Sequence, residues 1–267
     1  MKIKEFVKIS GSGNDFIMVD NRGGLKNPSQ KHIKEICAKG TGVGSDGLIF
    51  LESPQKNGDF RMVYYNRDGR EADMCGNGGR AVALYARLIG AVKKNTMLFE
   101  SRKSIHRAEL KKNNLVKIEL QKPNSLKRDI VLKTSRGIIG GTYINTGVPH
   151  FVIFVNDIEK TDVNTLGREI RFHKKFGKQG TNVDFIESKK NKILMRTYER
   201  GVESETLACG TGAAASAIVY NLLKGKKSPI KIQTRSKEVL TVYFNENLND
   251  IFLEGKVTIV YEGMLLI

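Results

Sequence analysis

Two short stretches decide the fold of this chain: Cys75-Gly-Asn-Gly-Gly-Arg-Ala-Val-Ala-Leu and Cys209-Gly-Thr-Gly-Ala-Ala-Ala-Ser-Ala. In each, a cysteine precedes glycines and a run of good helix formers, so each cysteine is predicted to lie at a helix N-terminus. Free backbone N–H groups and the positive end of the helix dipole favour a thiolate there and bind anions. The cysteines are 134 residues apart (209 − 75), half of the 267-residue chain. Two such helix ends suggest two opposed thiols.

Other landmarks repeat at nearly the same offset, as an internal duplication requires. Gly13 and the apolar run after it correspond to Gly147 and its own run, 134 residues on (147 − 13). Two further pairs have offsets of 133 (198 − 65) and 135 (181 − 46): Tyr65-Asn66-Arg67 with Tyr198-Glu199-Arg200, and 46–52 with 181–187. The common order indicates two copies of one module, each of roughly 130 residues.

Each copy has the pattern of a sheet around one apolar helix. Short β-branched and aromatic runs bounded by Gly or Pro predict buried strands, and the closing strands are joined by hairpin turns. The apolar helices are predicted at 80–89 and 213–223, with polar helices at 29–38 and 162–170. We therefore predict an α/β (α+β) fold of two pseudo-symmetric domains, each a mixed, largely antiparallel sheet curled around a central helix.

The boundary between the modules is predicted near Lys122-Pro123-Asn124-Ser125. This gives an N-terminal module over 1–122 and a C-terminal module over 123–255. The last strand, about 256–267, is left over and is expected to return to the first module.

Composition excludes several classes of protein. The charged start of the chain and the absence of a long apolar run predict a soluble, cytoplasmic protein with no membrane partner. Three cysteines without a CxxC pair predict reduced thiols and no metal site, and Cys37, unmatched in the repeat, is interpreted as a core residue. The formal charge of +17 raises the possibility of nucleic-acid binding. Because the basic residues are scattered without interleaved aromatics, we interpret them as a solvated surface and predict no nucleic-acid partner.

Several short strings occur together in one order: Gly13-Asn14-Asp15-Phe16, Asp46-Gly47, Asn66 with Asp68-Gly69, Cys75-Gly76-Asn77-Gly78, Pro149-His150, Asn182, Tyr198-Glu199-Arg200-Gly201 and Glu205-Thr206-Leu207-Ala208-Cys209-Gly210-Thr211-Gly212. In these strings the chain resembles, over essentially its whole length, the diaminopimelate epimerases, cofactor-independent epimerases of bacterial lysine and cell-wall biosynthesis. The resemblance implies two pseudo-symmetric domains with the active site in the cleft between them. It also implies conversion of LL-2,6-diaminopimelate to meso-diaminopimelate.

The reaction explains why two thiols are needed. Epimerisation removes the α-proton from one face of a carbon and returns a proton to the other, which suits Cys75 and Cys209 as base and acid. No cofactor is predicted: the glycine loop 40–44 lacks the Gly-Lys-Ser/Thr of a P-loop, and nothing indicates a pyridoxal-phosphate site. The carbanion must then be stabilised by electrostatics, for which the N–H groups around Gly76-Asn77 and Gly210-Thr211 could bind the α-carboxylate.

The resemblance assigns the remaining site residues. It makes His150 and Glu199 catalytic residues, Glu199 also a partner of the substrate ammonium, and Arg200 a clamp on the distal carboxylate. A turn histidine and a surface ion pair are the structural alternatives for these three. It makes three asparagines substrate contacts, although each could be a turn former: Asn14, Asn66 and Asn182.

One departure concerns the loop before His150. The family commonly has Gly-Asn-Pro-His where this chain has Gly147-Val148-Pro149-His150. Valine cannot replace the amide of asparagine as a hydrogen-bonding group. The resemblance therefore leaves open whether the distal site differs in detail.

Three other functions are compatible with parts of the pattern. A proline racemase-like enzyme shares the fold and the thiol pair, but its substrate has one carboxylate, whereas Glu199, Arg200 and the asparagines suit a second amino-acid end. Phenazine-biosynthesis-like isomerases share the fold and lack the thiol pair. A basic nucleic-acid-binding protein would leave Cys75 and Cys209 without a role.

The C-terminal segment 256–267 is apolar and needs a partner surface. Completion of the first module's sheet would supply part of it. The family resemblance also implies a homodimer supported by a tyrosine seven residues from the end, which is the place of Tyr261. We therefore expect a C2 homodimer.

Overall fold

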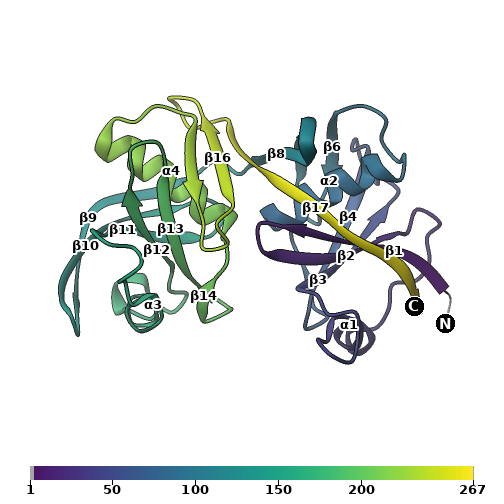
Figure 1. The fold of residues 1–267 in the computed structure, drawn as a ribbon, viewed down its shortest axis with the longest axis horizontal. Coiled ribbons are helices and arrows are strands. Elements are labelled where there is room, and N and C mark those ends of the chain that lie inside the picture. Colours follow the sequence, from purple (N-terminus) through teal and green to yellow (C-terminus); the bar gives the residue numbers. More distant parts are fainter. Residues whose placement is uncertain (1–2, 267) are drawn as a thin grey trace. The chain divides into compact units, whose positions relative to one another are not determined.

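The computed structural model describes residues 3–266, which form two compact units (Figure 1). The first unit contains the described residues up to Glu119 together with the chain from Gly255 onward, and the second contains Leu120–Glu254. No helix among these residues is long and apolar enough to cross a membrane.

The first unit is a mixed sheet curled around helix α2 (Gly76–Leu88), with the shorter α1 (Gln30–Cys37) on its other side (Figure 1). Strands β1 and β2 are antiparallel, β2 and β3 parallel, β3 and β4 antiparallel, and β4 and β6 parallel. A meander, β6 to β8, follows. The strands are β1 (Ile3–Gly11), β2 (Asn14–Asp20), β3 (Gly47–Glu52), β4 (Phe60–Asn66), β5 (Glu71–Ala72), β6 (Thr96–Glu100), β7 (Ile105–Leu110) and β8 (Leu115–Leu120).

The second unit repeats this arrangement around α4 (Gly210–Lys224), with α3 (Val163–Arg171) in place of α1. Strands β10 to β13 and β15 pair with the same alternation as β1 to β4 and β6. The strands are β9 (Asn124–Thr134), β10 (Gly137–Asn145), β11 (Pro149–Phe154), β12 (Asn182–Ser188), β13 (Ile193–Glu199), β14 (Ser204–Thr206), β15 (Ile230–Gln233), β16 (Val239–Phe244) and the start of β17 (Ile251–Leu266). The predicted fold class is confirmed.

Strand β17 belongs to both sheets. Its residues 251–254 pair with β16 in the second unit, and from Val257 onward it runs antiparallel to β1 in the first. The strand predicted over about 256–267 is therefore part of a longer, 16-residue strand that begins in the second unit. The side chain of Leu266 and all of Ile267 lie outside the described residues.

The apolar helices begin at the residue after each cysteine, earlier than the predicted starts at 80 and 213. The prediction placed the glycines outside the helices because glycine is a poor helix former. Packing requires glycine there: a Cβ on Gly79 would lie 2.4 Å from Cδ1 of Ile118. The glycines are therefore the first turn of each helix and allow the helix to approach its sheet closely.

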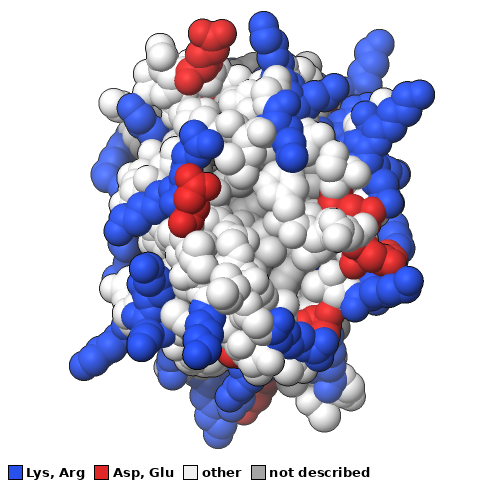
Figure 2. Space-filling view, turned by 90° about the vertical axis from the view of Figure 1, so that its left-hand side faces the viewer, with Lys and Arg blue, Asp and Glu red and all other residues white. Residues whose placement is uncertain are grey.

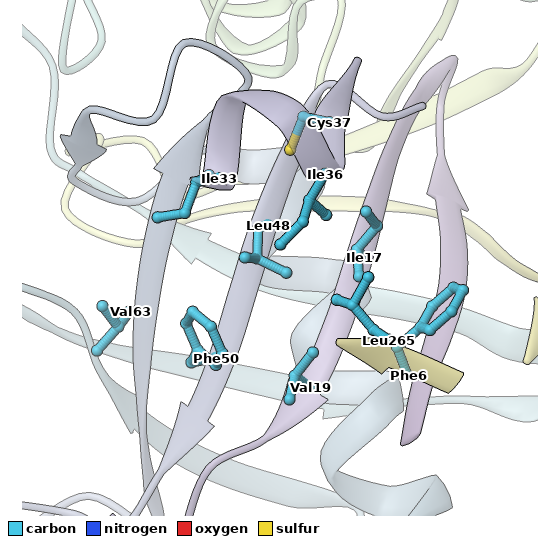
Figure 3. Packing of buried hydrophobic residues seen from close by; sticks show 10 residues of the cluster. All are labelled: Phe6, Ile17, Val19, Ile33, Ile36, Cys37, Leu48, Phe50, Val63 and Leu265. Carbon is cyan, nitrogen blue, oxygen red and sulfur yellow. The ribbon is translucent and has the colours of Figure 1, made fainter. Parts of the chain in front are cut away.

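One core cluster of the first unit lies between α1 and the strands (Figure 3). Ile33 and Ile36 of α1 pack onto Leu48 of β3 in a cluster of fully or almost fully buried side chains. Cys37, 3% exposed, belongs to this cluster. A second cluster, around Phe151 and Phe185, fills the corresponding place in the second unit.

Candidate active site

Cys75 is the N-cap residue of α2, with extended backbone angles (φ −107°, ψ 135°). Its carbonyl accepts from the N–H of Gly79 at 2.7 Å, which fixes the first helical turn. The thiol is half-buried. The first N–H groups of any helix have no partner within the helix, so those of Gly76 and Asn77 are placed to bind an anion next to this thiol.

A hydrogen-bonded set of amides lies beside the Cys75 helix. Asn77, 2% exposed, donates from Nδ2 to Oδ1 of Asn14 at 2.6 Å and accepts at Oδ1 from Nη2 of Arg80 at 2.9 Å. Asn14 donates in turn to Oδ2 of Asp46 at 3.0 Å. The structure thus brings two predicted site residues, Asn14 and Asn77, into direct contact. Asn66 is exposed at the end of β4, in register with Gly47 of β3.

Cys209 is the N-cap residue of α4, with similar backbone angles (φ −127°, ψ 113°) and 7% exposure. Burial raises the pKa of this thiol well above its ordinary value, and the negative charges of Glu199 and Asp184 raise it further. Hydrogen bonds with the Thr211 hydroxyl and the Gly212 N–H only partly offset this increase. Cys209 therefore carries its proton at neutral pH.

His150 connects Cys209 to a buried carboxylate. Its Nδ1 lies 2.7 Å from Oδ2 of Asp184, and both side chains are fully buried. Its Nε2 lies 2.9 Å from Oγ1 of Thr211, which is 3.4 Å from Sγ of Cys209. The other carboxylate oxygen of Asp184, Oδ1, accepts from the hydroxyl of Thr197 at 2.7 Å. These contacts form a continuous polar chain from Asp184 to the Cys209 thiol.

Asn182 holds the backbone around this chain. Its Oδ1 accepts from the N–H of Arg200 at 2.7 Å, and its Nδ2 donates to the carbonyl of Pro149 at 3.0 Å. Nδ2 also lies 3.4 Å from Nε2 of His150. The amide therefore positions both His150 and the turn that carries Arg200.

Glu199 and Arg200 lie at the end of β13, half-buried, and the turn after them is fixed by a buried arginine. Arg171 donates from Nε and Nη2 to Oε1 of Glu203, at 3.2 and 3.0 Å, and from Nη1 to the carbonyl of Gln179 at 3.1 Å. The Arg200 guanidinium approaches the same carbonyl at 3.5 Å. Arg171 thus fixes the turn that carries Arg200.

The model of the Diaminopimelate epimerase family matches residues 6–126 and 142–260 of the chain. The chain is 46% identical to the diaminopimelate epimerase of Aquifex aeolicus, over 98% of this chain and 97% of that protein. It is 40% identical to the diaminopimelate epimerase of Chlorobaculum tepidum, over 96% of this chain and 99% of that protein. The chain belongs to the diaminopimelate epimerase family.

Two solved structures show how widely the epimerase fold occurs. A phenazine biosynthesis protein of the PhzF family from Bacillus anthracis has a TM-score of 0.77 at 17% identity, with full coverage of both chains. A hydroxyproline epimerase from Agrobacterium vitis has a TM-score of 0.72 at 12% identity, covering 98% of this chain and 92% of that one. At these identities the likeness shows the fold alone.

The interval between the two matched segments of this epimerase, 127–141, falls on the β9–β10 hairpin. Val131 and Ile138 are 60% and 78% exposed there. Val148, where the family commonly has asparagine, is only half-buried in the loop that follows the hairpin.

Sequence reasoning missed Asp184 of this epimerase as a site residue. The available signal was a single acidic residue in an otherwise apolar strand, Val183-Asp184-Phe185-Ile186. A charge at such a position is fully buried only when it has specific partners. Arg80, fully buried in helix α2 next to the apolar run 81–84, is a second example of the same signal.

The remaining observations concern metal, charge and the C-terminal strand. Among residues 3–266, no group of three or more His, Cys, Asp or Glu could hold a metal ion. Figure 2 shows basic side chains dispersed over one face, with acidic ones among them. Some are paired, as Arg136 is with Asp162 at 2.8 Å.

Tyr261 is 44% exposed on β17 and packs edge-on against Phe6, with ring centroids 5.9 Å apart.

Proposed function

We propose that this protein interconverts LL-2,6-diaminopimelate and meso-diaminopimelate with Cys75 and Cys209 as its acid and base. The observation that carries the proposal is the repeated environment of the two thiols, each at the N-cap of the central helix of its unit. Family membership gives the substrate. The product would serve lysine and peptidoglycan synthesis in the cytoplasm.

The protonation of Cys209 sets the direction of the first step. A buried thiol with a raised pKa is an acid, so Cys75 is the base for a substrate whose α-hydrogen faces it. The α-proton passes to Cys75, and the Cys209 proton is delivered to the opposite face of the carbon. In the reverse reaction the roles are exchanged, so that Cys209 is the base and Cys75 the acid.

The carbanion is stabilised without a cofactor. As charge moves into the α-carboxylate, N–H groups around Gly76-Asn77 and Gly210-Thr211 bind it with the positive ends of two helix dipoles. Preorganised donors of this kind stabilise a transition state by several kcal/mol, on the order of 3 kcal/mol for each donor.

The second amino-acid end of the substrate requires charged and amide groups. We assign the ammonium to Glu199 and the distal carboxylate to Arg200, whose planar fork suits bidentate binding. Asn14, Asn66 and Asn182 are assigned as polar contacts, with Asn182 acting mainly through the backbone it holds.

The expected result is conversion of LL-diaminopimelate to the meso isomer by purified protein without added cofactor. Chiral chromatography of the reaction measures it, with chelator present and pyridoxal phosphate omitted. L-Proline is the control substrate, because a proline racemase of the same fold would convert it instead. Proline racemisation without diaminopimelate conversion would overturn the assignment.

We also propose that the protein acts as a C2 homodimer through the C-terminal strand, on which Val260, Tyr261 and Met264 are exposed apolar side chains. Tyr261→Ala is expected to shift the protein toward monomers and to lower activity, because it removes apolar contact area at this surface. Light scattering over a concentration series measures the shift. Ile138→Ala, at an exposed apolar residue of the other unit, should change neither property. A wild-type monomer with full activity at micromolar concentration would exclude the dimer.

A further inference from the structure

Asp184 is a fully buried carboxylate in the apolar strand β12. A carboxylate leaves water only where several donors surround it, because an unpaired buried charge is strongly unfavourable. Two donors are present: Nδ1 of His150 and Oγ1 of Thr197, each 2.7 Å from a carboxylate oxygen. The close packing of this carboxylate indicates a defined role.

The direction of the hydrogen bonds around His150 follows from backbone groups. The N–H of Arg200 can only donate, so Oδ1 of Asn182 is its acceptor and the amide NH2 must face the other way. That NH2 lies 3.0 Å from the carbonyl of Pro149 and 3.4 Å from Nε2 of His150. Because an amide NH2 only donates, Nε2 is the nitrogen with the lone pair.

The contact at Nδ1 of His150 indicates the same tautomer of the ring. An ionised Asp184 can only accept, so Nδ1 of His150 carries the hydrogen. The Thr211 hydroxyl, 2.9 Å from Nε2, then donates to it, and the Cys209 thiol donates to Thr211. The amide of Asn182 and the carboxylate of Asp184 thus indicate the same tautomer of His150, and the contacts of Thr211 are compatible with it.

We propose that Asp184 is a positioning residue that holds His150 as the Nδ1–H tautomer, so that Nε2 remains the proton acceptor of the site. The nearest source of a proton is Cys209, through Thr211. The thiol proton moves to the Thr211 oxygen while the Thr211 hydroxyl proton moves to Nε2. The products are a Cys209 thiolate and an imidazolium held by the Asp184 carboxylate, so atoms and charge balance.

This role answers a requirement of the reversible reaction. Cys209 is protonated at rest, yet it must act as a base for a substrate whose α-hydrogen faces it. The thiol then needs a group that takes its proton when it acts as the base, and His150 is that group. The inference rests on the proposed two-thiol function and adds the route by which one thiol is deprotonated.

The tautomer is tested directly by nitrogen-15 NMR of labelled histidine. The chain has four histidines, and the His150 signals are identified by their loss in His150→Gln. Neutral His150 protonated at Nδ1 is expected in the wild type, with loss of this single tautomer in Asp184→Asn. Protonation at Nε2 in the neutral wild-type ring would overturn the proposal. This readout needs no substrate, so it stands even if the proposed function fails.

The kinetic test uses single-thiol enzymes and β-halo analogues of diaminopimelate, from which one base removes the α-proton as halide leaves. In Cys75→Ser, where Cys209 is the base, Asp184→Asn should lower the rate of halide release about 10- to 100-fold. In Cys209→Ser, where Cys75 is the base, the same change should have less than about a twofold effect on the rate. Equal losses in both backgrounds would show a purely structural role, and no loss in the Cys75→Ser background would overturn the proposal.

Two further variants complete the test. Glu187→Gln changes a buried carboxylate of the same strand, one that binds the N–H of Ile158, and should move neither readout. Thr211→Val removes the hydroxyl between His150 and Cys209 without touching Asp184. It should slow halide release by Cys209 and leave the tautomer intact, so it tests the route even if Asp184→Asn does not fold.

Discussion

Cys75→Ser and Cys209→Ser should each reduce epimerisation at least about a thousandfold, the upper range for loss of one general acid or base. A serine hydroxyl is a far weaker acid than a cysteine thiol, so it cannot replace the thiol as acid or base near neutral pH. Chiral chromatography of the reaction with each variant measures the loss. Near-normal epimerisation by either variant would contradict the two-thiol mechanism.

The same variants contain their own control for folding. Each should still release halide from the β-halo analogue whose α-hydrogen faces the remaining thiol, because that reaction needs a base on one face only. Cys37→Ser is the matched control for loss of a thiol. Cys37 is buried in the core cluster of the first unit, so its replacement should lower stability and leave the turnover per folded enzyme within about twofold.

Gly212→Ala is expected to have the second largest effect. A Cβ at this position would lie 2.5 Å from Oδ1 of Asp184 and 3.3 Å from Cβ of Cys209. The helix start or the Asp184–His150 pair must then move. Because displacements of about 1 Å at a catalytic site lower rates on the order of 100-fold, kcat should fall by at least that factor.

Gly140→Ala is the control for this substitution, since a Cβ there would meet no atom within 4 Å. Its kcat and its midpoint of thermal unfolding should match those of the wild type. The two readouts separate catalytic displacement from unfolding in Gly212→Ala. An unchanged kcat for Gly212→Ala would show that the close approach of α4 to Asp184 is not needed for catalysis.

The duplication could be predicted because corresponding motifs recur in the same order at a nearly constant offset in the sequence. A cysteine followed by glycine and a helix-forming run indicates a helix N-terminus by local chemistry alone, and the structure places Cys75 and Cys209 at N-caps. The limits of the helices could not be predicted in the same way. They depend on how closely each helix packs on its sheet, which is a tertiary effect.

The β9–β10 hairpin was not predicted as strands, for a related reason. The stretch Lys127-Arg128-Asp129 and the glycines of β10 oppose a strand by propensity. Strand β9 pairs with β10, and β10 pairs with β11 on its other side. The hydrogen bonds of these pairings override that propensity. Strand β1, where Lys4, Glu5 and Lys8 interrupt the apolar residues, was missed as well.

The candidate site was predictable as a set of residues and only partly as contacts. Asn14 and Asn77 bond to each other, and His150 lies one hydroxyl away from Cys209. The role of Asn182 in holding backbone groups could not be predicted from the sequence. Residue type alone does not distinguish an asparagine in a turn from one in a strand or a binding site.

The central claim, that two thiols act on opposite faces of one carbon, is tested most directly by early-time isotope exchange in deuterated water. LL-diaminopimelate is converted to a few per cent, and product and remaining substrate are separated and analysed by mass spectrometry. The account predicts deuterium at one α-carbon of the meso product and almost none in the remaining LL substrate, since each face has its own acid. Equal deuterium in substrate and product from the first turnovers, or a product without deuterium, would contradict it.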